Sequence, residues 1–232
     1  MLTFAVPCLW KSRSQSGRYI SVARAPVMSP RSMMPVPRIP IRTSLLYDLL
    51  MPDRLYFTDD DAANALIAAD PLALLIGFAL DQQVTVPTAF TGPLKLEQRL
   101  GRLDAAEIAG MDPAKLEGVF REKPAVHRFP GNMAKRVQDL CVEIVSEYGG
   151  DASRVWTDAS DDADLRKRIK SLPGFGDMKV KALGAVLAKR YGVAAAEGLV
   201  PPHPTLGDVD SPEALVTYQA AKRAHKAKLK AQ

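Results

Sequence analysis

A short turn in the last third of the chain carries residue types that could hold a phosphate. In the segment L-P-G-F-G, Leu172, Gly174, Phe175 and Gly176 stand between two expected helices. Glycine reaches positive φ at no steric cost and lets another backbone approach closely. The helix that follows would present unpaired N–H groups and its positive dipole end at the same point. We therefore expect these four residues to bind a phosphate oxygen.

Cations are concentrated around this turn. Between positions 166 and 190 there are eight lysines and arginines against Asp177 alone, a local charge of +7. Lys179 and Lys181 follow the turn directly and are candidates for further phosphate contacts. Such a site would hold a nucleic-acid backbone without reading its sequence, which the charge concentration favours. The alternative is that the glycines only form a tight turn between two helices, and that the lysines of these helices lie on a solvent-exposed face.

The charge of the whole chain is weaker evidence, because it is unevenly distributed. The formal net charge is +5, but residues 1–50 hold seven lysines and arginines against Asp48, which leaves −1 for the rest. Residues 1–50 also contain a stretch rich in Pro, Ser and Arg, which predicts a disordered N-terminal extension. A transit peptide and a start site assigned too far upstream are the alternatives. We expect the folded domain to span residues 51–232.

Helix-start signals recur from residue 58 onward. Asp70-Pro71 and Asp112-Pro113 each place a capping side chain before a proline in the first turn. The stretch 71–83 is apolar on nearly every face, which predicts a buried central helix. No segment of useful length alternates with period two, so the predicted fold class is all-α. Further helices are expected after Thr58 and Asp104, over 131–148, in a hairpin at 164–192 and in a basic C-terminal helix at 211–230.

Three stretches resemble, in the expected order, the HhH-GPD superfamily of base-excision DNA glycosylases. The hairpin reads L-P-G-F-G-x-x-K, residues 74–86 read LLIGFALDQQVTV, and residues 127–151 read HRFPGNMAKRVQDLCVEIVSEYGGD. The resemblance implies a two-lobed helical fold with a helix-hairpin-helix motif. It also implies that double-stranded DNA lies across the cleft and that a damaged nucleotide is flipped into it. Gln82 and Gln83 then stand where a residue of the family fills the gap left by the flipped base.

The carboxylate that the resemblance implies has no match at its usual position. In the family, an aspartate downstream of the hairpin stabilises the developing sugar cation or activates water, but Ala196 stands near that position. Glu197 could replace it, or Asp208 or Asp210 could reach the cleft through a longer loop. The alternative is that these acids are solvated or cap the last helix. The protein would then bind or sense damaged DNA without cleaving it.

The nucleophile of the lyase members is also displaced. In those members, a lysine two residues after the second glycine forms a Schiff base. Met178 occupies this position, and Lys179 is rotated about 100° further around the helix. We therefore expect a monofunctional DNA N-glycosylase that removes damaged or mispaired bases, without AP-lyase activity. A helical interaction module with a purely structural hairpin is a third hypothesis.

We expect no cofactor. Cys8 and Cys141 are too few for a four-thiolate iron–sulfur cluster, and the histidines lack partners at metal-binding spacing. A monovalent cation at the hairpin is compatible with the resemblance. No apolar run is long enough for a membrane span, so we expect no membrane-spanning segment. We also expect a cytoplasmic, nucleoid-associated monomer whose partner is double-stranded DNA. His127 would touch DNA beside Arg128 or lie on the plain surface.

Overall fold

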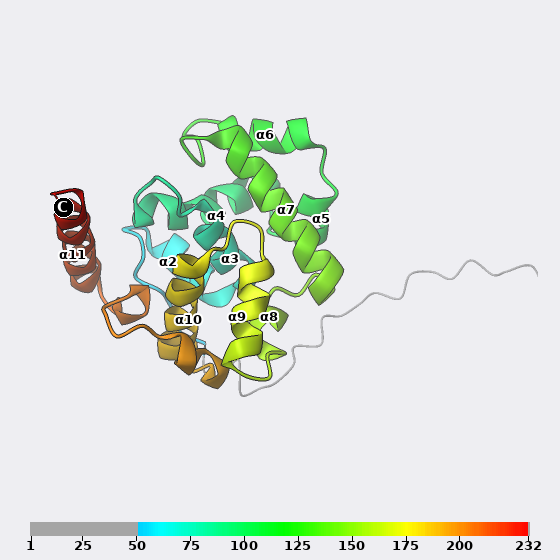
Figure 1. The fold of residues 1–232 in the computed structure, drawn as a ribbon. Helices are drawn as coiled ribbons and strands as arrows, with labels where there is room; N and C mark the ends of the chain where they lie inside the picture. The colour runs from blue at the N-terminus through cyan, green and yellow to red at the C-terminus, as the bar shows by residue number, and fades with distance from the viewer. Residues whose placement is uncertain (1–50, 232) are drawn as a thin grey trace, which may run out of the picture. The chain divides into compact units, whose positions relative to one another are not determined.

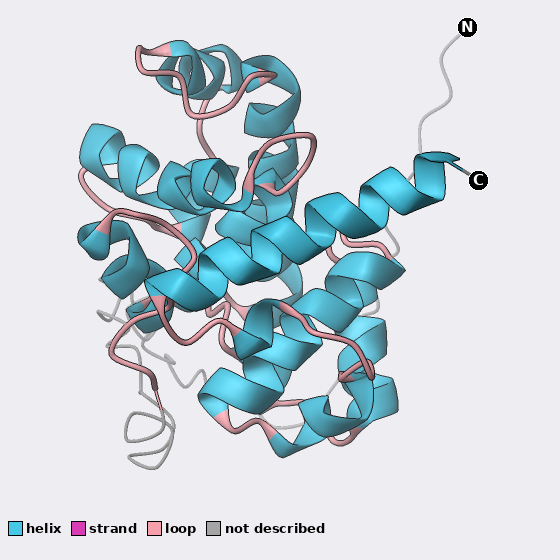
Figure 2. Cartoon of the chain, turned by 90° about the vertical axis from the view of Figure 1, so that its left-hand side faces the viewer, coloured by secondary structure: helices cyan, strands magenta, loops and turns pink. Residues whose placement is uncertain are grey.

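The computed structural model describes residues 51–231, with side chains as far as Ala224. These residues form helices joined by turns, without a strand among them (Figure 2). The all-α prediction is therefore confirmed for this part of the chain, and the predicted extension at 1–50 lies outside it. The longer helices are α2 (Asp61–Ala69), α3 (Pro71–Leu80), α4 (Val86–Leu100), α6 (Pro113–Arg121), α7 (Pro130–Tyr148), α9 (Asp162–Ser171), α10 (Asp177–Tyr191) and α11 (Pro212–Ala231). The short ones are α5 (Ala105–Ala109), α8 (Arg154–Thr157) and the 3-10 helices η1 (Ala194–Leu199) and η2 (Leu206–Asp208).

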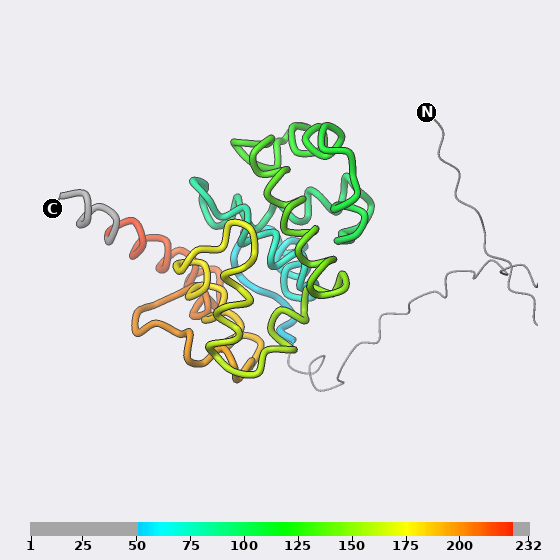
Figure 3. Tube along the Cα trace, turned by 45° about the vertical axis from the view of Figure 1, so that its right-hand side comes forward, coloured from blue at the N-terminus to red at the C-terminus, as the bar shows by residue number. Residues whose placement is uncertain are grey.

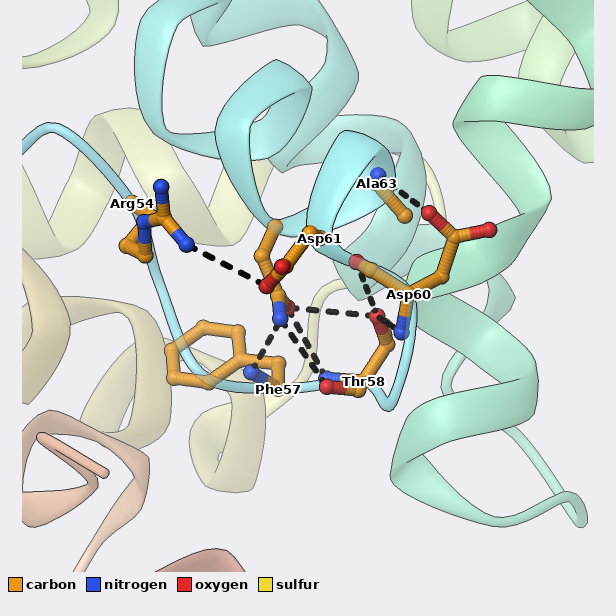
Figure 4. A network of polar contacts seen from close by, with 7 residues as sticks. Arg54, Phe57, Thr58, Asp60, Asp61 and Ala63 are labelled. Carbon is orange, nitrogen blue, oxygen red and sulfur yellow. Dashed lines mark hydrogen bonds and ion pairs between the residues drawn. The ribbon is translucent and has the colours of Figure 1, made fainter. Parts of the chain in front are cut away.

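The first described turn is held by the buried side chain of Asn64. Its Oδ1 accepts the N–H groups of Phe57 and Thr58 at 3.1 and 3.0 Å, and its Nδ2 donates to the Thr58 carbonyl at 2.9 Å. Figure 4 shows this network, in which the Thr58 hydroxyl donates to the carbonyl of Asp60. The carboxylate of Asp60 accepts the Ala63 N–H at 3.1 Å. Asp60 is therefore the cap of α2, and the prediction that Thr58 caps it was wrong by two residues.

The predicted central helix is present as α3. Its nine residues from Leu72 to Leu80 are buried, and the Asp70 carboxylate accepts the Leu72 N–H at 2.8 Å. The helix ends at Leu80 rather than at 83, so residues 81–85 form a turn at its C-terminal end. This turn carries the two glutamines that the resemblance singles out.

Helix α4 packs closely against α3, although the sequence signals do not predict it. A Cβ built on Gly77 would lie only 2.4 Å from the ring of Phe90, so glycine is needed for this contact. Pro93 lies inside α4, where it cannot donate a backbone hydrogen bond to the preceding turn. Thr85 with Pro87 in the first turn is a local start signal, and it is Pro93, inside the helix, that argues against a helix in the sequence.

Helix α7 runs beside α5 and α6, and the loop between α9 and α10 rises towards it (Figure 1). Gly149 ends α7 as a C-terminal cap, since it adopts φ 65° directly after Tyr148. The trace in Figure 3 shows the same approach of the α9–α10 loop to α7 from another side. In the described part of the chain, no single helix is long and apolar enough to cross a membrane. Only α2 and α3 taken together across a bend of 115° meet that measure.

Candidate nucleic-acid interface

The hairpin turn contains one glycine in the left-handed region. Gly174 has φ 84°, whereas Gly176 has φ −91°, so the positive φ that both glycines permit is used by Gly174 alone. The Phe175 N–H donates to the Leu172 carbonyl at 3.1 Å and closes the turn. Both of these side chains are buried, which leaves the backbone as the accessible part of the turn.

The two glycines differ in what surrounds them. A Cβ on Gly174 would lie 2.8 Å from Cδ of Arg136, so this position is closed by the arginine of α7. A Cβ on Gly176 would meet no atom within 4 Å. Neither φ nor packing requires a glycine at position 176. The space over Gly176 is therefore open to a group from outside the chain.

The backbone donors at the start of α10 are unpaired. Gly176 caps α10 without a side-chain hydrogen bond. Among the described residues, the N–H groups of Gly176, Asp177 and Met178 have no acceptor. Asp177 places one carboxylate near them, and its pKa is lowered by the hydrogen bond from Lys170 at 2.9 Å. The first turn of α10 thus offers free donors beside an acid that is already paired with a cation.

Lys179 connects this turn to the end of α3. Its Nζ donates to the Ala79 carbonyl at 3.3 Å and lies 5.4 Å from the centre of the Phe175 ring. Burial lowers the pKa of Lys179 to about 8, against an opposing effect of the Asp81 carboxylate. Met178, in the position of the family's lysine, is 75% exposed.

The turn after α3 is attached to α7. The guanidinium of Arg136 donates to the side-chain oxygen of Gln82, and Nε2 of His127 donates to the Gln82 carbonyl at 3.1 Å. Nδ1 of His127 accepts the Phe129 N–H at 3.1 Å, which fixes the neutral ring in the Nε2–H form. The prediction of a surface or DNA-contacting His127 was wrong, because the ring is only 2% exposed and serves as a structural link.

A hollow of about 620 Å³ lies where the two turns meet α7. It brings together three of the predicted residues, Gln82, Gln83 and Gly174, which are far apart in the sequence. Both glutamines are exposed, but Gln83 alone of the two adopts φ 58° and has no hydrogen bond partner among the described residues. The other residues that line the hollow are Phe129, Asn132, Met133, Lys135, Arg136, Asp139 and Pro173.

Phe129, Asn132 and Asp139 are members of this lining that sequence reasoning did not predict as site residues. The only signal for them was their place in the segment that resembles the family. Lys135 and Arg136 follow in the same segment and are cationic.

The net positive charge around the hairpin is lower than the sequence suggests, because some of its cations form ion pairs. Three of the eight form ion pairs: Arg168 with Asp164 at 2.9 Å, Lys170 with Asp177 at 2.9 Å, and Lys189 with Asp208 at 2.6 Å. Asp164 lies just before the counted stretch and Asp208 well after it, so a local count misses both. The exposed cations without an ion pair among the described residues are Arg166, Lys167 and Lys181.

The three predicted carboxylates lie on exposed positions and do not line the hollow. Glu197 is on η1. Asp208 accepts the Thr205 N–H at 2.8 Å in a capping box. Burial raises the pKa of Asp208, but the hydrogen bonds from Lys189 and Thr205 outweigh it, so the net pKa is lowered. Asp210 precedes α11, whose cap is instead Ser211, which accepts the Ala214 N–H at 3.1 Å.

Asp81 is a further carboxylate beside the two turns. It follows the last residue of α3, is half-buried, and interacts electrostatically with Lys179 and with Tyr218 of α11. Among the described residues, no three His, Cys, Asp or Glu side chains come together as a metal site. The cation that the resemblance allows at the hairpin stays a prediction. One carbonyl of that turn, that of Leu172, accepts the Phe175 N–H.

No protein-family model matches this chain, and comparisons with curated proteins and with solved structures find no match.

Proposed function

We propose that this chain is a base-excision repair protein of the HhH-GPD type that binds double-stranded DNA through the hairpin between α9 and α10. The observation that carries the proposal is the open space and the unpaired backbone donors at Gly176. Gly176 is a glycine that neither backbone strain nor packing requires, and its own N–H and those of Asp177 and Met178 have no acceptor among the described residues. A backbone phosphate satisfies such donors and needs the space that a side chain would occupy.

The neighbourhood of the hairpin supports the same partner. The side chain of Arg136 lies against Gly174, and Nζ of Lys179 lies 5.4 Å from the centre of the Phe175 ring, so two cations contact the turn. Lys181, two residues after Lys179 on α10, is exposed. Contacts of this kind reach phosphate oxygens and carry no base information, so binding is expected to be independent of sequence.

The chemical step that we propose is removal of a damaged or mispaired base without strand cleavage. The C1′–N bond breaks, the base leaves with the bonding electrons, and a carboxylate stabilises the cation that forms on the sugar. Water then adds through its oxygen to C1′, and its proton passes to a carboxylate. Asp81 is the half-buried carboxylate next to the hairpin, while Glu197, Asp208 and Asp210 are the exposed alternatives.

A second candidate is a protein that binds damaged DNA and leaves the base in place. The observation that favours it is the use of Asp208 in a capping box and an ion pair, together with the exposed positions of Glu197 and Asp210. The binding half of the proposal is common to both candidates, and only the chemical step separates them.

Two measurements test the proposal. Binding to a fluorescent duplex should weaken linearly in a plot of log affinity against log salt, with a slope of about −0.9 for each phosphate neutralised. An affinity that does not change with salt would contradict phosphate binding. A panel of duplexes that each carry one damaged base, treated with hot alkali after incubation, should show scission of one member. Scission before the alkali step would contradict the absence of lyase activity.

A further inference from the structure

We propose that the last part of α11 is a cationic arm that binds phosphates of the DNA duplex outside the hairpin site and holds the chain on undamaged DNA. This inference rests on the DNA binding proposed above and adds a second surface to it. The arm consists of residues 222–231, which are helical. Its cationic residues are Lys222, Arg223, Lys226, Lys228 and Lys230.

The beginning of α11 is the part that packs against the rest of the chain. Leu215 is 3% exposed, and α11 packs against η2. Tyr218, one turn further on, is still partly buried against the core. From Ala220 to Ala224 every residue is exposed, and α11 leads away from the other helices in Figure 1 and in Figure 3. The start of the arm is therefore accessible to a partner and is not part of the core.

The arm carries cations without acids to pair with them. Residues 214–232 contain no Asp or Glu. Lys222 and Arg223 form no ion pair among the described residues. In α7, by contrast, Lys135 is paired with Asp139 four positions later at 2.6 Å. The positive charge of the arm is thus available to an anionic partner.

The rest of the domain has the opposite charge. Residues 51–232 carry a formal charge of −1 although the arm contributes +5, so residues 51–221 carry −6. A net negative body is repelled by a polyanion, and a local cationic surface is needed to overcome this repulsion. The arm supplies such a surface outside the hairpin.

The spacing of the lysines in the arm is unfavourable for an isolated helix. Lys222, Lys226 and Lys230 are four positions apart, so they occupy neighbouring places on one face of the helix. Like charges at this spacing destabilise a helix, and the helix dipole favours cations only in the last turn. A row of phosphates neutralises such a face and removes the repulsion. The charge pattern therefore favours DNA as the partner of the arm.

The arm starts near the hairpin site. Tyr218 interacts electrostatically with Asp81, and Asp81 interacts with Lys179 at the start of α10. Nζ of Lys222 lies 5.9 Å from the centre of the Tyr218 ring, so the first cation of the arm is close to this group. The helix from 222 to 230 rises about 12 Å, which is roughly three to four nucleotide steps of one strand. A duplex held at the hairpin can therefore meet the arm over a few further phosphates.

The test measures binding of the full chain to an undamaged fluorescent duplex at stepped salt. The glutamine variant carries Lys222→Gln, Arg223→Gln, Lys226→Gln, Lys228→Gln and Lys230→Gln. Glutamine and lysine have similar helix propensities, so the variant loses charge and keeps the helix. Its plot of log affinity against log salt should be shallower than that of the wild type by at least about 1.8, the value for two phosphates. The matched control carries arginine at the four lysine positions and should keep the wild-type slope.

The outcomes separate this inference from the proposal on which it rests. Equal slopes for the wild type and the glutamine variant, at equal unfolding midpoints, would overturn the arm and leave the hairpin as the binding site. If Gly176→Leu binds as the wild type does while the glutamine variant loses slope, the arm stands and the hairpin proposal is contradicted. If the wild type binds no duplex, both are overturned. Sedimentation of the wild type but not of the glutamine variant with phosphatidylserine vesicles, together with equal duplex slopes, would assign the arm to a lipid surface instead.

Discussion

Lys179 donates a hydrogen bond to the carbonyl of Ala79, which lies 100 positions earlier in the chain. The last carbonyls of a helix have no partner within it, and a cation is favoured at this end of the helix dipole. The lysine at the start of α10 therefore caps the C-terminal end of α3. It fixes the hairpin turn against the glutamine turn.

The lowered pKa of Lys179 predicts opposite pH effects on binding and on folding. Its amine loses its proton as the pH rises through about 8, so DNA affinity should fall between about pH 7 and pH 9. The unfolded chain keeps this proton to higher pH, so the free energy of unfolding should rise over the same interval. Fluorescence anisotropy and denaturant unfolding measure the two quantities.

Variants at this position serve as controls. Lys179→Arg remains charged throughout this range, so its DNA affinity should not change with pH between these values. Lys179→Met should bind more weakly than the wild type at pH 7 and should also show no step. If DNA affinity still falls over this pH range in both variants, another group is responsible for the fall.

His127 predicts an acid-sensitive turn. Burial is the largest cause that lowers its pKa, so the neutral ring is stabilised in the folded chain. The unfolded chain takes up the proton at higher pH, and the free energy of unfolding should decrease as the pH falls below about 6.5. His127→Gln should reduce this decrease, as measured by thermal unfolding at about pH 5 and about pH 7.5. An equal decrease in variant and wild type would show that another group is responsible.

Substitutions of the two glutamines should have different effects on stability and on duplex affinity. Both side chains are exposed, but that of Gln82 is held by Arg136, whereas that of Gln83 has no partner among the described residues and is free to enter a duplex. Gln83→Ala should therefore lower affinity for a mismatched duplex more than for a matched one. Gln82→Ala should instead lower stability and affect both duplexes equally. Gln83→Gly provides a check on the backbone, because φ 58° is favourable for glycine.

The carboxylate of the chemical step can be assigned with four matched variants. Asp81→Asn should reduce base release by about 10²-fold or more, while DNA binding stays within about twofold of the wild type. Glu197→Gln, Asp208→Asn and Asp210→Asn should each retain most of the activity. A large loss in one of these three, with Asp81→Asn fully active, would move the assignment to that residue. Base release by none of the proteins, wild type included, would favour the non-catalytic candidate.

Helix boundaries marked by a single strong signal could be predicted from the sequence. The pairs Asp70-Pro71 and Asp112-Pro113 begin α3 and α6 as expected, because capping and the N1 proline act within one turn. The start of α2 differs because Asn64 recruits Thr58 for a buried network, which leaves Asp60 as the cap. Helix α4 begins at a local signal, Thr85 followed by Pro87, but it continues through Pro93, and its packing against α3 is a tertiary contact that local signals cannot indicate.

The site could be predicted in its parts but not in its assembly. The glycine turn and the glutamines were visible as motifs, yet the contact of Arg136 with Gln82 joins residues 54 positions apart. The charge of the hairpin was overestimated because Asp208 arrives from η2 to pair with Lys189. Both effects come from tertiary contacts that carry no local pattern.

Substitution of Gly176 tests the central claim most directly. Gly118 of α6 provides the matched control, because a Cβ there also meets nothing within 4 Å and its φ is not positive. If a DNA phosphate occupies the space over Gly176, Gly176→Leu should weaken duplex binding by at least about tenfold at an unchanged unfolding midpoint, and Gly118→Leu should not weaken it. Equal duplex affinities for Gly176→Leu, Gly118→Leu and the wild type would contradict the account.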